Sequence, residues 1–335
     1  MTTMKEIAQK AGVSRATVSR VINGHSSVSA EKRKIVMEWV RKLDYQPNKI
    51  AQSLVQSQSH LIGVIVPNIS NPFFSEIIDT VEYEANRQGY SIVVCNTRGN
   101  IQKEKNHINT LKSRQVDGIL IVPIIDINTP HIDSFQQGDI PVVAITRKVH
   151  KFDSVLVSHK EGGAQVARHF IDMGHRDIGF IGLTKDEKFK GLKGELNKNG
   201  IEFDSYNLIE GGYEGRISSE KVYTQVKDYL DKGKLKATAF FAYNDLAALG
   251  AIHAFQDYGL KIPDDIIVAG FDDIFLASQV RPNLTSVAQP TQEMGRVAIE
   301  ILLNRISEEN TKDKLEIELE PSLIVRESTR GINFK

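Results

Sequence analysis

The chain has 335 residues, of which 41% are hydrophobic, 25% charged and 7% aromatic, and its formal net charge is zero. This composition excludes a disordered or fibrous chain and predicts a globular protein of two to three domains. The one cysteine, Cys95, excludes an intramolecular disulfide, and the lack of a signal-peptide core or a membrane-length apolar run predicts a cytoplasmic protein with no membrane partner.

The charge is unevenly distributed along the chain. Residues 1–60 contain ten Lys/Arg and four Asp/Glu, a net of +6, so residues 61–335 carry −6. A basic N-terminal segment on an acidic remainder predicts a polyanionic partner for the first 60 residues only.

Two short helices are predicted near the N-terminus. Apolar residues recur at helical spacing in 4–11 and again in 15–22, with Gly12 between them and Ser14 at the N-cap of the second helix. This pattern is typical of a helix-turn-helix, whose second helix lies in the DNA major groove. A helical hairpin that only adds solubility has the same pattern. The polar face of the second helix carries Arg15, Ala16, Thr17, Ser19 and Arg20.

A third helix and a linker follow. The third helix is predicted from an apolar stripe formed by Ile35, Val36, Trp39, Val40 and Leu43. The single tryptophan, Trp39, is expected in the core. Asn48 can cap a further helix over 48–55, which is too short to be stable alone and needs a partner. Its Leu54 could enter a DNA minor groove and kink the duplex, whereas a plain flexible tether is the alternative.

Three motifs then occur in order. They are Ile-Ala-x-x-Ala-Gly-Val-Ser-x-Ala-Thr-Val-Ser-Arg-Val-Ile-Asn-Gly from residue 7, Tyr-x-Pro-Asn with Ala-x-x-Leu from residue 45, and Ile-Gly-Val-Ile-Val-Pro-x-Ile-x-Asn-Pro-Phe-Phe from residue 62. Together they resemble the LacI/GalR family of bacterial transcription regulators, from about residue 4 to about residue 329. The resemblance implies that the hinge helix folds only when two subunits sit on operator DNA, and that Leu54 enters the minor groove.

The resemblance also implies that Arg15 and Ala16 occupy base-reading positions. The candidate DNA-contacting residues are Thr3, Lys5, Ser14, Arg15, Ala16, Thr17, Ser19, Arg20, Asn23, His25, Tyr45, Asn48, Ala51 and Leu54.

From residue 61 short β-rich runs alternate with amphipathic helices, which is typical of doubly wound parallel sheets. Strands are predicted at 61–66, 91–96, 118–122, 142–145, 177–183, 206–210, 237–242, 266–271, 315–319 and 323–326. Helices are predicted at 74–88, 101–114, 162–173, 187–199, 215–230, 245–258 and 291–306.

The predicted fold class is an N-terminal all-α helix-turn-helix domain plus an α/β periplasmic-binding-protein-like body of two doubly wound parallel-sheet subdomains. The expected divisions are a DNA-binding domain at 1–45, a hinge helix and linker at 46–59, and an effector-binding and dimerisation domain at 60–335. Its first subdomain would comprise about 60–159 and 291–320, and its second about 160–290 and 321–330.

Ligands of such sheets bind beyond the carboxyl ends of the strands. Polar side chains there, each explicable alone as a cap or a solvated charge, together favour a binding site, and Phe73 in a strand-end loop could stack on a ligand ring. With the resemblance, the candidate effector-binding residues are Asn71, Phe73, Phe74, Arg147, His159, Lys188, Asn244 and Asp272.

The chain departs from the family at three positions whose side chains usually bind sugar hydroxyls. It has Thr146 where the family usually has Asp, Ser158-His159 in place of Asp-Asn, and Lys188 in place of Arg. Lysines in these loops are compatible with an anionic effector such as a sugar phosphate, and a solvated lysine-rich rim explains them equally well. These lysines are Lys148, Lys160, Lys185, Lys188 and Lys190.

No phosphate-binding loop, nucleophile elbow or metal-ligand spacing is found in the sequence, so we expect no enzyme, cofactor or metal. The predicted function is a homodimeric repressor of a sugar-utilisation operon that binds operator double-stranded DNA under the control of a small-molecule effector, a sugar or sugar phosphate. The alternatives are a regulator that responds to a purine or nucleoside corepressor or to a partner protein, and a sugar-binding module without regulatory switching.

Overall fold

The computed structural model describes residues 3–22, 24, 27–45, 58–124, 140–149, 151–210, 219–307 and 313–330. The chain forms two compact units, residues 1–59 and 60–335, here called the head and the body. The expected hinge helix lies outside the described residues, and so do the candidates Asn23, His25, Asn48, Ala51 and Leu54.

The described part of the head contains the helices α1 (Met4–Ala11), α2 (Arg15–Ile22) and α3 (Ala30–Lys42). A capping box starts α1, because the Thr3 hydroxyl accepts from the Glu6 amide and the Glu6 carboxylate accepts from the Thr3 amide. Gly12 ends α1 in the left-handed conformation, with φ of 64°. The Ser14 hydroxyl then accepts from the Thr17 amide at 3.1 Å, as the sequence predicted.

The core of the head is small. It consists of Ile7, Ala8, Val18, Val21 and Val36, surrounded by partly buried apolar residues. The predicted stripe of α3 was wrong at Ile35, which is 39% exposed, because Val36 takes the core-facing position and the next residue along a helix is rotated by about 100°. Trp39 is only partly buried, and the ammonium groups of Lys10 and Lys42 lie 5.8 and 5.0 Å from its ring centroid.

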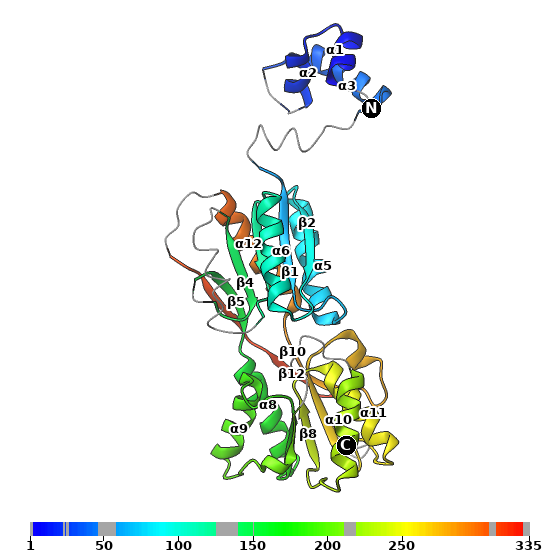
Figure 1. The fold of residues 1–335 in the computed structure, drawn as a ribbon, viewed down its shortest axis with the longest axis vertical. Coiled ribbons are helices and arrows are strands. Elements are labelled where there is room, and N and C mark those ends of the chain that lie inside the picture. Colours follow the sequence, from blue (N-terminus) through cyan, green and yellow to red (C-terminus); the bar gives the residue numbers. More distant parts are fainter. Residues whose placement is uncertain are drawn as a thin grey trace. The chain divides into compact units, whose positions relative to one another are not determined.

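The body consists of two halves, each built on a six-stranded sheet (Figure 1). The strands of the first sheet run in the order β11-β5-β4-β3-β1-β2, and all its pairings are parallel. They are β1 (Leu61–Val66), β2 (Ser91–Asn96), β3 (Gly118–Ile121), β4 (Val142–Thr146), β5 (Asp153–Val157) and β11 (Glu316–Leu319).

Helices cover both faces of the first sheet. On β1, Ile62, Val64 and Val66 pack with α5 (Pro72–Arg87) and α12 (Thr291–Ser307), whereas Ile65 packs with α6 (Ile101–Ser113). This alternation follows from the two-residue period of a strand buried on both faces. Cys95 lies in the α6-facing cluster as a buried free thiol.

The second sheet has the strand order β12-β10-β9-β8-β6-β7, and only the pairing of β12 with β10 is antiparallel. Its strands are β6 (Ile178–Ile181), β7 (Leu208–Ile209), β8 (Ala239–Ala242), β9 (Ile267–Asp272), β10 (Thr285–Ala288) and β12 (Ser322–Ile324). Its helices pack in pairs, α8 (His159–Asp172) with α9 (Glu187–Lys198) and α10 (Ser219–Asp231) with α11 (Asp245–Asp257).

The predicted fold class is therefore confirmed, although two strands were missed. β5 begins with Asp153 and Ser154 and β10 with Thr285 and Ser286, so each carries too few apolar residues to be recognised. The polar residues are buried because they have partners. Asp153, for example, accepts two hydrogen bonds from the Arg305 guanidinium at 2.8 and 2.9 Å.

Element boundaries differ slightly from the prediction. α8 begins three residues earlier than expected, because Gly162 and Gly163 lie within it and glycine is a poor helix former. In the part of the chain that the structure describes, no helix has the length and apolar character required to cross a bilayer.

Candidate functional sites

The polar face of α2 is presented to solvent. Arg15, Ala16 and Arg20 are exposed, Thr17 and Ser19 are partly buried, and the opposite face is anchored in the core of the head. Arginine side chains displayed in this way can donate two hydrogen bonds to guanine, and nearby hydroxyl groups suit phosphate oxygens. The exposed face of α2 is therefore free to carry the DNA contacts that the sequence predicts.

The other described DNA candidates surround α2 in sequence and serve the scaffold as well. Thr3 and Lys5 are exposed, and Tyr45 is partly buried against the core of the head. The Ser14 hydroxyl also lies 2.9 Å from the Thr17 hydroxyl. Thr3 and Ser14 are therefore helix caps whether or not they touch DNA.

A cavity of about 390 Å³ lies in the body between its two halves. This volume is in the range that holds one small molecule. The structure brings all eight sequence-predicted effector residues to this cavity, namely Asn71, Phe73, Phe74, Arg147, His159, Lys188, Asn244 and Asp272.

Two residues at strand ends of this cavity have left-handed backbone. Thr146 ends β4 with φ of 72° and Asp272 ends β9 with φ of 110°. Non-glycine residues adopt this region only when the surrounding structure holds them there, and such residues gather at functional sites.

Asp272 is held by side chains from both halves. Gln289 donates its amide to Asp272 Oδ1 at 2.7 Å. Burial raises the pKa of Asp272 to about 6, against the opposing effects of Lys188, Gln289 and Asn71, which favour the charged carboxylate. The pKa of Asp272 thus lies just below neutral pH.

Lys188 and His159 both lie against the ring of Phe271. The Lys188 ammonium donates to the Tyr243 carbonyl at 2.7 Å and lies 4.0 Å from the Phe271 ring centroid. His159 meets the same ring edge-on at 5.5 Å. Burial, together with the positive charges of Lys188 and Arg147, lowers the pKa of His159 to about 3, so its imidazole is neutral at physiological pH.

Asn71 and Asn244 are helix caps as well as cavity residues. Asn71 Oδ1 accepts from the Phe73 amide at 3.2 Å, and Asn244 Oδ1 accepts from the Ala247 amide at 2.9 Å. The prediction for Phe73 was wrong about its setting. It lies in the first turn of α5 and is only 4% exposed, with Phe74 edge-on at 5.1 Å, because α5 begins directly after the Asn71 cap.

Residues outside the eight candidates also line the cavity, and of these only Thr146 and Lys185 were singled out from the sequence. The other residues around the cavity are Pro67, Asn68, Gly99, Ile101, Val122, Pro123, Ile124, Thr146, Lys185, Asp186, Tyr243 and Gln289. Gln289 directly follows β10, the strand that was not recognised, and Tyr243 directly follows β8. The rule that ligands bind beyond strand ends would have found Gln289 had β10 been recognised, and it already applied to Tyr243, because the strand predicted at 237–242 ends directly before it.

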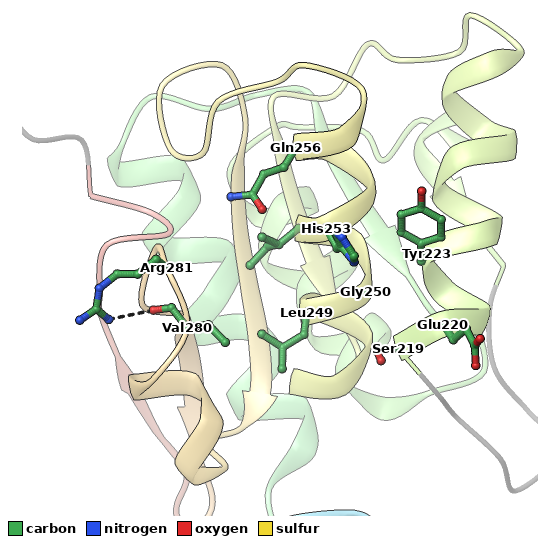
Figure 2. A pocket seen from close by; sticks show the side chains of 10 residues that line it. Ser219, Glu220, Tyr223, Leu249, Gly250, His253, Gln256, Val280 and Arg281 are labelled. Carbon is green, nitrogen blue, oxygen red and sulfur yellow. Dashed lines mark hydrogen bonds between the residues drawn. The ribbon is translucent and has the colours of Figure 1, made fainter.

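A second concave surface, here called the α10–α11 groove, lies on the second half of the body (Figure 2). Its volume is about 630 Å³. Leu249 and His253 project from α11, Tyr223 from α10, and Val280 and Arg281 come from a neighbouring loop. No pattern in the sequence indicated this groove. Among the described residues no group of three His, Cys, Asp or Glu side chains could hold a metal ion.

Comparisons with known proteins agree with this geometry. Residues 3–48 match the family of bacterial regulatory proteins of the lacI type, and residues 167–329 match the periplasmic binding protein-like domain. The HTH-type transcriptional repressor PurR of Photobacterium profundum is 34% identical, over 99% of this chain and 100% of its own.

Two solved structures are similar throughout. The lac repressor dimer bound to operator and the anti-inducer ONPF has a TM-score of 0.87 and 28% identity, over 98% of this chain and 99% of its own. The complex of the transcriptional regulator CelR with cellobiose has a TM-score of 0.72 and 28% identity, over 98% of this chain and 100% of its own. The chain therefore belongs to the LacI family of DNA-binding transcriptional regulators, in which a helix-turn-helix head is joined to a periplasmic-binding-protein-like, effector-binding body.

Proposed function

We propose that this regulator is a repressor of a sugar-utilisation operon and that a small effector in the body cavity switches its affinity for operator DNA. The observation that carries the proposal is the cavity itself, in which polar side chains from both halves surround a space of about 390 Å³. A ligand that touches both halves can favour one relative arrangement of them over another. Because operator DNA lies in the cytoplasm, we expect the protein there, associated with the nucleoid when bound.

For DNA, we propose that Arg15, Ala16 and Arg20 read base edges and that the hydroxyl groups near them contact phosphates. The described DNA candidates are Thr3, Lys5, Ser14, Arg15, Ala16, Thr17, Ser19, Arg20 and Tyr45. Arg20→Ala should weaken binding to an operator obtained by in vitro selection by about 10- to 100-fold. Lys227→Ala, which removes an equal charge from an exposed position of α10, is the control, and an equal loss in both variants would refute a reading role.

For the effector, a sugar or sugar derivative is supported by the side chains that face the cavity. Asp272, Asn71 and Asn244 offer carboxylate and amide groups for hydroxyls, and the similar CelR was solved with cellobiose. Arg147, Lys185 and Lys188 line the same space and suit a phosphorylated derivative.

A purine or nucleoside corepressor is the second candidate. Relatives named PurR are 32–35% identical over nearly the whole chain, and Phe74 gives the cavity an aromatic wall on which a flat ring could stack.

We also propose that the chain works as a homodimer, which suits a two-fold symmetric operator. The lac repressor, similar over nearly the whole chain, was solved as a dimer on its operator. The α10–α11 groove, with Leu249 partly exposed in it, is the surface we would test. Leu249→Glu should yield monomers in sedimentation equilibrium, and an unchanged dimer would exclude this surface.

Thermal unfolding against a compound panel tests the proposal for the effector. The panel would contain ribose, cellobiose, glucose, glucose 6-phosphate, hypoxanthine, guanine and adenosine. A compound present at 100 times its Kd should stabilise the body by about 2.7 kcal/mol, which gives a clear shift. The shift should vanish in Asp272→Asn and persist in Asp231→Asn, an exposed carboxylate at the end of α10. No shift with any compound would contradict the proposal and favour a partner protein as the signal.

A further inference from the structure

The segment that follows β9 reaches from the second half of the body into the first. Asp272, the last residue of β9, lines the cavity. Ile274, two residues further on, is 1% exposed in a hydrophobic cluster of the first half, which also contains Ile77 of α5 and Met294 of α12. Phe275, the next residue, is 61% exposed. Ile274 therefore anchors this segment of the second half in the core of the first.

The backbone between the cavity and this anchor needs outside support. Asp272 and Asp273 both have left-handed backbone, with φ of 110° and 53°. Residues other than glycine adopt this region only when their surroundings hold them there. The path of the chain from Asp272 to Ile274 therefore depends on the groups that contact it.

Asp245, the first residue of α11, supplies that support, and it is completely buried. Its Oδ2 accepts from the Ile274 amide at 2.8 Å, and its Oδ1 accepts from the Ser286 hydroxyl at 2.5 Å. The Ser286 hydroxyl oxygen accepts in turn from the Asp273 amide at 3.1 Å. One carboxylate thus holds the amides of the two residues that follow Asp272, one directly and one through Ser286.

Gly270 of β9 makes room for this carboxylate, because a Cβ at that position would overlap with Asp245 Oδ1. Burial raises the pKa of Asp245 well above its usual range, and the negative charge of Asp272 acts in the same direction. Burial of this acidic group therefore opposes folding. The benefit of the carboxylate lies in the segment that it holds.

We propose that Asp245 is a positioning residue that sets, through Ser286 and the Ile274 amide, how the two halves of the body are joined. The segment that it holds has Asp272 at the cavity and Ile274 in the core of the first half. Packed side chains and hydrogen bonds of this kind carry a displacement from one end to the other. The part that this segment plays in switching rests on the proposed effector function, whereas its part in joining the halves does not.

Hydrogen exchange, measured by mass spectrometry on the full-length protein without ligand, tests this role because it reports on each half separately. Asp245→Ala, although it lies in the second half, should raise exchange about 10-fold in α5 and α12 of the first. Asp245→Asn, which keeps an oxygen for the Ile274 amide, should stay within about 2-fold of wild type there. Val226→Ala is the control, because it opens a cavity in the core of the second half at α10. It should raise exchange in the second half only.

Ile274→Ala supplies the decisive background because it removes the anchor itself. Adding Asp245→Ala to it should change exchange in α5 and α12 by less than about 2-fold. A full 10-fold increase there would overturn the proposal, since the effect would then reach the first half by another route. Leu246, which follows Asp245 and packs against the same cluster, is such a route. The proposal is also overturned if Asp245→Ala alone leaves α5 and α12 unchanged, or if Val226→Ala affects them equally.

Ser286→Ala decides the matter if Asp245→Ala does not fold. It removes the hydroxyl donor to Asp245 and the acceptor of the Asp273 amide. Exchange in α5 and α12 should rise by about 3-fold, and this rise should disappear in the Ile274→Ala background. No rise, or a rise that persists in that background, would overturn the proposal. Since no ligand is used, this test can fail while the effector proposal stands, and the compound panel can fail while the joining role stands.

Discussion

The head and the body cavity present polar groups to a ligand in opposite ways. In the head, Arg15 and Arg20 stand exposed on a helix whose other face fills a small core. In the body, Lys188 and Asp272 are less than a tenth exposed, and Asp272 sits in left-handed backbone at a strand end.

The difference is energetic as well as geometric. An exposed arginine contributes little to the free energy of unfolding, so the residues proposed to read DNA can change without a change in the fold of the head. A buried carboxylate in a strained conformation opposes folding and persists only because its surroundings over-determine it. We therefore expect function and stability to be separable in the head and coupled in the cavity.

Close packing behind the cavity should give the largest effect. Gly163→Ala puts a Cβ 2.0 Å from the Lys188 carbonyl oxygen, and backbone cannot yield as a flexible side chain can, so the body should lose about 3 kcal/mol in urea unfolding. Gly194→Ala in α9 is the matched control. Its Cβ meets nothing within 4 Å, and the change should stabilise the helix by up to about 1 kcal/mol. Similar losses in both would show that α8–α9 packing is not the cause.

Asp272→Asn should have the opposite effect and stabilise the body. The pKa of Asp272 is raised to about 6 in the folded chain from 3.8, so the folded state binds the proton more tightly, and stability falls as pH rises from about 4 to 6. Removing the charge should therefore stabilise the body by about 1–3 kcal/mol at pH 7 and by little at pH 4. Unfolding curves at the two pH values check this, and a loss of stability at pH 7 would disprove the strain attributed to this carboxylate.

The smallest effect is expected in the head. Ser14→Ala removes the acceptor of the Thr17 amide and should cost the head about 1 kcal/mol. Arg15→Ala, one residue on and exposed, should change its stability by less than about 0.5 kcal/mol. Trp39 is the only tryptophan, so its fluorescence reports on the head alone. Equal losses of stability in Ser14→Ala and Arg15→Ala would mean that the residues proposed to contact DNA also stabilise the head.

What the sequence could predict follows the same contrast. Helices α1 and α2 are encoded locally, by Gly12, Ser14 and apolar spacing, and they were placed correctly. The eight cavity residues could be predicted because the carboxyl ends of parallel strands meet at one edge of a sheet. The exposure of Ile35 and the hydrogen bond from Gln289 to Asp272 depend on how elements distant in sequence pack together, and no local pattern contains that information.

Control of the head by the cavity can be measured directly. The most direct measurement is fluorescence anisotropy of a labelled, in vitro selected operator, titrated with wild type and Asp272→Asn, with and without the panel compound that shifts the melting temperature of the wild type. The compound should change the operator Kd of the wild type by about 5- to 150-fold, in either direction, and leave that of Asp272→Asn unchanged. A compound that binds the wild-type body but leaves its operator Kd unchanged would contradict the claim, and so would an equal response in both proteins.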